Sequence, residues 1–210
     1  MQRLFIQAAL AAATISIAAF SPAIAEEKTA DDTFVQQLYG REPGKGLTHA
    51  CFVRQYDFAH FAKHPKQKVS EMKLLVTAEI LPEDDKPNHA FNMDLRYKTR
   101  AGTFDTGGEC GHVKIGEAEN NEPRLGCGVD CDGGGLSMAL APDNKSVTVS
   151  LERVRIWRKT KPGASTAIEE EDLELKGGAD DRKFKLYRAD LSQCAALIRE
   201  RKELVALRDK

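Results

Sequence analysis

Hydrophobic and polar residues alternate along most of this chain, and a period of two is typical of half-buried β-strands. Between Met72 and Ile80 every second residue is apolar, and the residues between them are polar with one exception. The pattern repeats from Phe91 to Tyr97. Because the polar segment 81–88 joins the two stretches, the sequence predicts an antiparallel hairpin.

The alternation changes phase once, between the apolar series at 147–151 and the pair Val154 and Ile156. A single inserted residue has this effect in a β-bulge, so we expect a bulge near Glu152 or Arg153. Shorter or weaker strand patterns are present at 47–55, 103–113, 124–129, 136–140, 173–175 and 184–186.

These patterns predict an all-β fold of about eight to nine strands, with no long helix between them. Strands that follow one another so closely form an antiparallel meander, which closes into a barrel or folds as a sandwich. We favour the barrel because closure removes exposed strand edges. Its outline is similar to that of the lipocalin-like barrels, although the sequence contains no motif of that family.

Two helical segments interrupt the strand pattern. Residues 57–63 are expected to form a short helix that Pro65 terminates. Asp190 can cap a C-terminal helix, in which Leu191, Ile198 and Val205 follow helical spacing. Residues 46–210 then form a single domain, preceded at 26–45 by a polar, glycine-containing segment that we interpret as a flexible N-terminal arm.

The first 25 residues have the features of a secretory signal peptide. Arg3 precedes an apolar, alanine-rich stretch at 4–20, and small residues end the segment at Ala23 and Ala25. Cleavage after Ala25 would deliver the chain to the periplasm or the medium. Gln7 interrupts the apolar stretch, which is short for a transmembrane helix, so we expect no stable membrane span after cleavage.

Composition excludes several classes of protein. The 210 residues are 41% hydrophobic and 30% charged, with 31 Lys and Arg against 32 Asp and Glu. Disordered chains are poorer in apolar residues and further from neutrality, and polytopic membrane proteins need repeated long apolar runs. A near-neutral chain also makes nucleic acid an unexpected partner.

All of the cysteines follow the leader: Cys51, Cys110, Cys127, Cys131 and Cys194. An oxidising compartment favours disulfides between them. Antiparallel strands around the polar segment 117–123 would bring Cys110 opposite Cys127, with Cys131 as a competing partner. A bond between Cys51 and Cys194 would join the first strand to the terminal helix. The C-x3-C spacing differs from the C-x2-C spacing of redox and zinc pairs.

The segment 126–135 is unusually rich in glycine and holds two carboxylates, Asp130 and Asp132. It lacks the remaining ligands of a calcium loop and the lysine of a phosphate-binding P-loop. Gly133, Gly134 and Gly135 would permit positive φ angles or close strand approach in a tight, disulfide-braced corner. The alternative is the rim of a ligand or anion site.

Two further residue pairs are candidate sites. His60 and His64 would share one helical face, as in a two-ligand clamp for zinc or copper, although solvent-facing histidines have the same spacing. If Arg155 and Trp157 point together, they form an aromatic and cationic surface suited to an anionic ligand or partner. Packing at one end of the barrel is the alternative for Trp157.

We therefore expect an exported, non-catalytic binding or accessory protein of the bacterial envelope that needs no cofactor. Its partner would be a small molecule or an envelope protein. A carrier would hold an apolar or amphipathic molecule in the barrel, lined by Phe91, Met93, Leu95 and Tyr97.

Two alternatives belong to other classes. The first is a metal-dependent hydrolase that uses His60 and His64, which predicts a stoichiometric bound metal. The second is a partner-binding or inhibitory module that presents the Cys127–Gly135 loop, which predicts a filled interior and a rigid, protruding loop.

Overall fold

The computed structural model describes residues 28–113, 122–159, 173–199 and 204. In these ranges nine strands form one sheet in which every strand pairing is antiparallel, as the alternation predicts. The strands are β1 (Thr48–Gln55), β2 (Val69–Glu79), β3 (Asn88–Tyr97), β4 (Phe104–His112), β5 (Arg124–Gly128), β6 (Gly134–Leu140), β7 (Ser146–Arg158), β8 (Leu173–Lys176) and β9 (Lys183–Ala189). The helices are α1 (Ala30–Tyr39), α2 (Phe58–Lys63) and a 3-10 helix, η2 (Leu191–Leu197).

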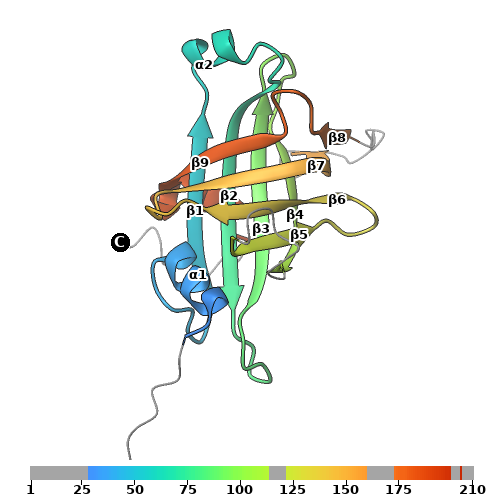
Figure 1. Ribbon diagram of the computed structural model, residues 1–210. Helices are drawn as coiled ribbons and strands as arrows, with labels where there is room; N and C mark the ends of the chain where they lie inside the picture. The colour runs from blue at the N-terminus through green and yellow to red at the C-terminus, as the bar shows by residue number, and fades with distance from the viewer. Residues whose placement is uncertain (1–27, 114–121, 160–172, 200–203, 205–210) are drawn as a thin grey trace, which may run out of the picture.

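The sheet closes on itself in a ring. Strands β1 to β7 each pair with the next, and β9 pairs with both β7 and β1, which completes the circuit. Figure 1 shows the long strands β1 to β4 crossed by β5, β6, β7 and β9. Strand β8 pairs with the C-terminal half of β7, from Arg153 to Ile156.

The predicted bulge is confirmed at Glu152. Gly135 of β6 lies opposite Arg153, and the next residue, Leu136, lies opposite Leu151, so Glu152 is the inserted residue. Because of this insertion, Val154 continues the buried face that Leu151 occupies before the bulge.

Side chains fill the inside of the ring. Phe52, Phe104 and Phe184 are fully buried and belong to one continuous hydrophobic core. Phe91, Met93 and Leu95, which we expected to line a ligand cavity, are at most 1% exposed in the same core, and Tyr97 packs against it. These side chains therefore serve as packing in the core.

Part of the segment interpreted as a flexible arm is helical. Thr29 and Asp32 form a reciprocal capping box at the start of α1, and Phe34, Val35 and Leu38 are buried against the sheet. Spacings of one and four residues place these apolar side chains on one helical face. The arm prediction missed this short stripe because polar residues surround it.

Arg188 of β9 holds the C-terminal end of α1. Its guanidinium donates hydrogen bonds to the carbonyl oxygens of Leu38 and Gln37, both at 3.0 Å, and to that of Asn144 at 2.9 Å. These carbonyls include groups that a helix end leaves without internal partners. A positive charge at this end of the helix also complements its dipole.

Asp190 caps the terminal helix as predicted, its carboxylate accepting from the Ser192 amide at 2.9 Å. The helix is nevertheless a 3-10 helix that ends at Leu197, because Ile198 returns to extended backbone. Most of the predicted continuation to Val205 lies outside the described residues. Leu204, which is described, packs against the small cluster around Leu197.

Two disulfides are present, one between adjacent strands and one between the sheet and the terminal helix. Cys110 of β4 is bonded to Cys127, its directly opposed residue on β5, and Cys51 of β1 is bonded to Cys194 of η2. Cys131 is free and exposed. The two disulfides indicate an oxidising compartment. Among the described helices, none has the length and hydrophobicity needed to span a membrane.

Candidate binding groove

A hollow of about 870 Å³ lies on the outer face of β5, β6 and β7. Its floor consists of residues with small side chains or none: Gly126, Gly128, Gly135, Ser137 and Ser150. Strand alternation turns these positions outward while Cys127, Leu136 and Leu151 point into the core. A surface with so few side-chain atoms is hollowed, and a ligand can approach its backbone closely.

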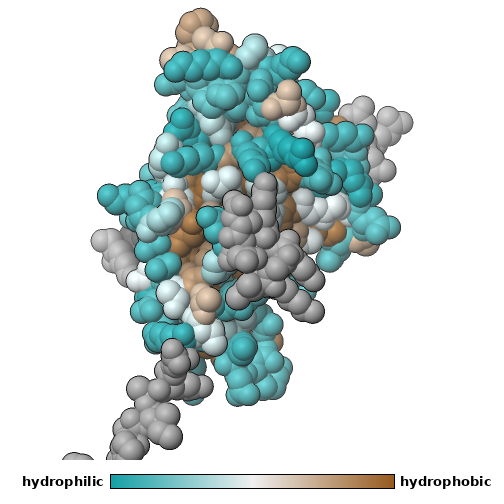
Figure 2. Space-filling view, in the orientation of Figure 1, coloured by the Kyte–Doolittle hydropathy of each residue, from teal (hydrophilic) through white to brown (hydrophobic). Residues whose placement is uncertain are grey.

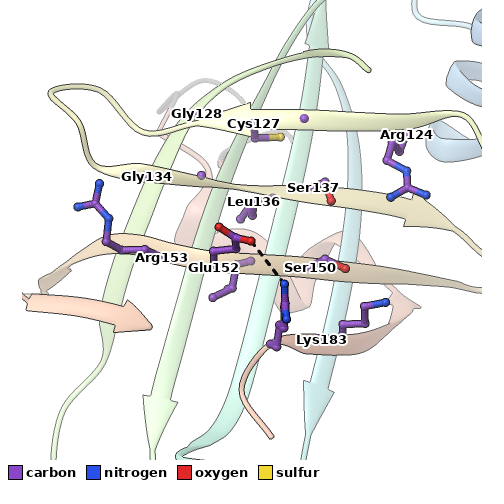
Figure 3. A pocket seen from close by; sticks show the side chains of 14 residues that line it. Arg124, Cys127, Gly128, Gly134, Leu136, Ser137, Ser150, Glu152, Arg153 and Lys183 are labelled. Carbon is purple, nitrogen blue, oxygen red and sulfur yellow. Dashed lines mark hydrogen bonds and ion pairs between the residues drawn. The ribbon is translucent and has the colours of Figure 1, made fainter. Parts of the chain in front are cut away.

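Cationic side chains surround this hollow. Arg124 and Arg153 stand at opposite ends, with Ser137 and Ser150 between them (Figure 3). Arg182 and Lys183 complete the edge, and Arg182 lies 3.4 Å from Glu152.

Arg153 is fixed in place by neighbouring groups. It donates to the Glu174 carboxylate at 2.8 Å and to the Asp132 carbonyl oxygen at 2.7 Å. The hydrogen bond from Arg153, with a second from Lys176, holds the pKa of Glu174 below its usual value. The guanidinium is therefore held at the edge of the hollow, and Glu174 balances part of its charge.

A second hollow of about 440 Å³ adjoins the first, since both are lined by Arg182 and Lys183. It adds Arg54, Lys185 and the aromatic rings of Tyr56 and Tyr187. The Arg54 guanidinium lies 4.9 Å from the Tyr187 ring centroid and 5.2 Å from that of Tyr56. Burial raises the pKa of Tyr56 to about 12, so its phenol stays uncharged.

We call the two hollows together the basic groove. Its six cationic side chains come from four strands and one connection: Arg54, Arg124, Arg153, Arg182, Lys183 and Lys185. Among the described residues that line it, only Glu152 and Asp180 are acidic. A concave surface with this imbalance favours an anion.

The two candidate metal ligands, His60 and His64, line the second hollow. Their rings stack with centroids 4.4 Å apart, and His60 Nε2 is 2.9 Å from the Gln67 amide oxygen. His64 Nδ1 lies 3.7 Å from Asp180. Within the described part of the chain, no group of three or more His, Cys, Asp and Glu side chains is arranged to hold a metal ion.

The glycine-rich segment forms the tight turn between β5 and β6. Cys131, Asp132 and Gly134 have left-handed backbone, with φ angles of 56°, 57° and 76°, and the Val129 amide donates to the Gly134 carbonyl oxygen at 2.9 Å. A Cβ atom at Gly134 would lie 2.1 Å from the Arg153 carbonyl oxygen, so close approach requires glycine there.

The predicted site residues of this turn separate into two groups. Gly134 and Gly135 line the groove, whereas Gly133 is buried beneath the turn. The carboxylates of Asp130 and Asp132 are exposed and lie outside the lining. The turn is therefore a braced corner at the edge of the groove.

Arg155 and Trp157 lie beyond the bulge on β7, on its outward face. Trp157 is 39% exposed and pairs with Asp105 of β4, where the end of β7 meets that strand. Neither residue lines the groove. The two side chains share the outward face of β7, and a second aromatic and cationic combination, Arg54 with Tyr187, lies in the groove.

None of the six cations of the groove was among the site residues predicted from sequence. Arg54, Arg124, Arg153 and the group at 182–185 are far apart in the chain, and only the closed sheet brings them together. The available signal was the run of small residues at outward positions, as at Gly126 and Gly128, because such a run predicts a surface without side chains.

No protein-family model matches this chain, and searches of curated proteins and of solved structures found no significant match.

Proposed function

We propose that this chain is an exported, non-catalytic protein of the bacterial envelope that binds an extended anionic ligand in the basic groove. The observation that carries the proposal is the concentration of charge: six cations and two carboxylates line the groove, whereas the whole chain is nearly neutral. The signal-peptide pattern at residues 1–25 and the two disulfides support export.

The shape of the groove favours a flat, chain-like ligand. Gly126, Gly128 and Gly135 leave space for such a chain against the sheet, and Ser137 and Ser150 offer hydroxyl donors on the floor. Cations at both ends and along one side would meet successive phosphate, sulfate or carboxylate groups. Tyr187, which is 43% exposed, adds an aromatic surface at the end of the groove beside Arg54.

Reversing the charge at the junction of the two hollows should weaken polyanion binding. We expect the double variant Arg182→Glu and Lys183→Glu to bind dextran sulfate at least tenfold more weakly than the unaltered protein, because attraction becomes repulsion where the hollows meet. Binding is measured by isothermal titration calorimetry at low and high salt, with neutral dextran as the ligand control. Salt should weaken the binding of the unaltered protein.

A matched charge reversal keeps this experiment specific. Lys45 and Lys86 are exposed lysines outside the groove, and the variant carrying Lys45→Glu and Lys86→Glu should bind almost as the unaltered protein does. If both double variants lost affinity equally, binding would depend on net charge and not on the groove. If dextran and dextran sulfate bound equally well, the electrostatic basis of the proposal would be wrong.

A further inference from the structure

Helix α2 projects at one end of the molecule, opposite the β2–β3 loop (Figure 1). We call residues 57–68 the α2 tip. Phe58 is 87% exposed, the most exposed large hydrophobic residue in the described part of the chain, and Ala59 and Ala62 are exposed beside it. In Figure 2 apolar atoms form the outermost point of this end, above a hydrophilic zone.

The other side of α2 fixes its orientation. Phe61 packs against the hydrophobic core, with the Lys98 ammonium 4.5 Å from its ring centroid. Asp57 caps the helix by accepting from the His60 amide at 2.8 Å. Phe58 occupies the first position of this helix and is exposed, while Phe61 and the Asp57 cap anchor the helix to the rest of the molecule.

Lysines surround the exposed apolar face. Lys63, Lys66 and Lys68 are all exposed. The nearby carboxylates are turned toward the backbone, since Asp180 accepts from the Lys66 amide at 2.9 Å and Asp181 from the Lys68 amide at 2.9 Å. These carboxylates fix the loop after α2 and leave the surface of the α2 tip cationic.

The opposite end of the molecule has the reverse character. The β2–β3 loop carries Glu83, Asp84 and Asp85 against one lysine, Lys86, and the first turn of α1 carries Asp31 and Asp32. An anionic surface would therefore attract the α2 tip and repel the other end, which favours a tip-first approach.

We propose that the α2 tip docks on an anionic lipid bilayer, with Phe58 inserted at the interface and the lysines against the lipid phosphates. Amphipathic segments that combine an aromatic residue with lysines bind membranes in this way. A single ring on a convex tip offers far less area than the ~800 Å² per partner of a stable protein interface. The α2 tip shares His60 and His64 with the second hollow, but Phe58 and the three lysines lie outside the lining of the basic groove. The proposal goes beyond the ligand of the groove and does not depend on it.

Cosedimentation with vesicles tests the docking. The unaltered protein should sediment with vesicles of equal parts phosphatidylglycerol and phosphatidylcholine, and much less with phosphatidylcholine alone. Phe58→Ala should weaken binding to the anionic vesicles about tenfold, as expected for losing a buried aromatic side chain. The double variant Lys63→Glu and Lys66→Glu should weaken it by at least as much.

Controls separate the α2 tip from other surfaces. Phe58 is solvent-exposed, so Phe58→Ala should leave the circular dichroism spectrum and thermal midpoint unchanged. Trp157→Ala, at an exposed aromatic residue elsewhere, and the pair Lys45→Glu with Lys86→Glu should keep vesicle binding. Arg182→Glu with Lys183→Glu should lose dextran sulfate and still bind vesicles. Absence of binding to anionic vesicles, or binding that survives both tip variants, would overturn the proposal.

Discussion

Replacing Cys51 and Cys194 together by alanine should lower the free energy of unfolding by about 5 kcal/mol. The bond joins residues 143 positions apart and ties η2 to β1, so it restricts the unfolded chain over most of its length. The cost of closing a loop grows with the logarithm of its length, and the Cys110–Cys127 bond, with a separation of 17, should contribute only about 3 kcal/mol.

Urea denaturation of the two double alanine variants measures this difference. The variant without the Cys51–Cys194 bond should unfold at the lower urea concentration. Reducing agent should lower the urea midpoint more in the other variant, which retains the Cys51–Cys194 bond. The opposite order would show that the stabilising effect of the disulfides is not governed by the length of chain they close.

The second large effect is expected in acid, at His89. This ring is 5% exposed, stacks on Tyr39 of α1, and has its Nδ1 atom 3.0 Å from the Tyr39 hydroxyl. Burial, with a smaller contribution from His112, lowers the pKa of His89 to about 4.

The unfolded chain binds this proton with a pKa of about 6.5, so it holds more protons than the folded chain between about pH 6.5 and pH 4. Stability must then fall as the pH falls through that window. His89 alone should lower the free energy of unfolding by about 3 kcal/mol between neutral pH and about pH 4.

Comparison with His89→Phe isolates this contribution from the carboxylates that also titrate. The variant loses the hydrogen bond to Tyr39 and should be less stable at neutral pH. Between neutral pH and about pH 4, however, its free energy of unfolding should fall by about 3 kcal/mol less than that of the unaltered protein. Parallel pH profiles for the two proteins would mean that His89 is not a buried neutral base.

Local alternation was sufficient to predict the strands and the bulge at Glu152, because both depend on which face of one strand each residue occupies. The short stripe of Phe34, Val35 and Leu38 in a polar segment was missed, since its burial depends on β-strands that are distant in sequence. The type of the terminal helix was also not predictable, because its Cys194 is bonded to Cys51 of β1 and its cap alone is compatible with either helix type.

The groove could not be predicted in the same way. Arg54, Arg124 and Arg182 lie far apart in sequence, and nothing near any of them indicates a shared surface. They meet because the ring closes between β7, β9 and β1. The expected ligand cavity was not predictable either. Alternation shows that Phe91, Met93 and Leu95 face inward, but it does not show that they pack tightly against the opposite strands.

The most direct test of the central claim uses Gly128 on the groove floor. A Cβ atom there would meet no atom within 4 Å, so Gly128→Glu should fold normally and place a carboxylate in the hollow. Gly44 has equally open surroundings outside the groove, which makes Gly44→Glu the matched control. The account predicts that Gly128→Glu binds dextran sulfate at least tenfold more weakly while Gly44→Glu binds normally; unchanged binding in folded Gly128→Glu would contradict it.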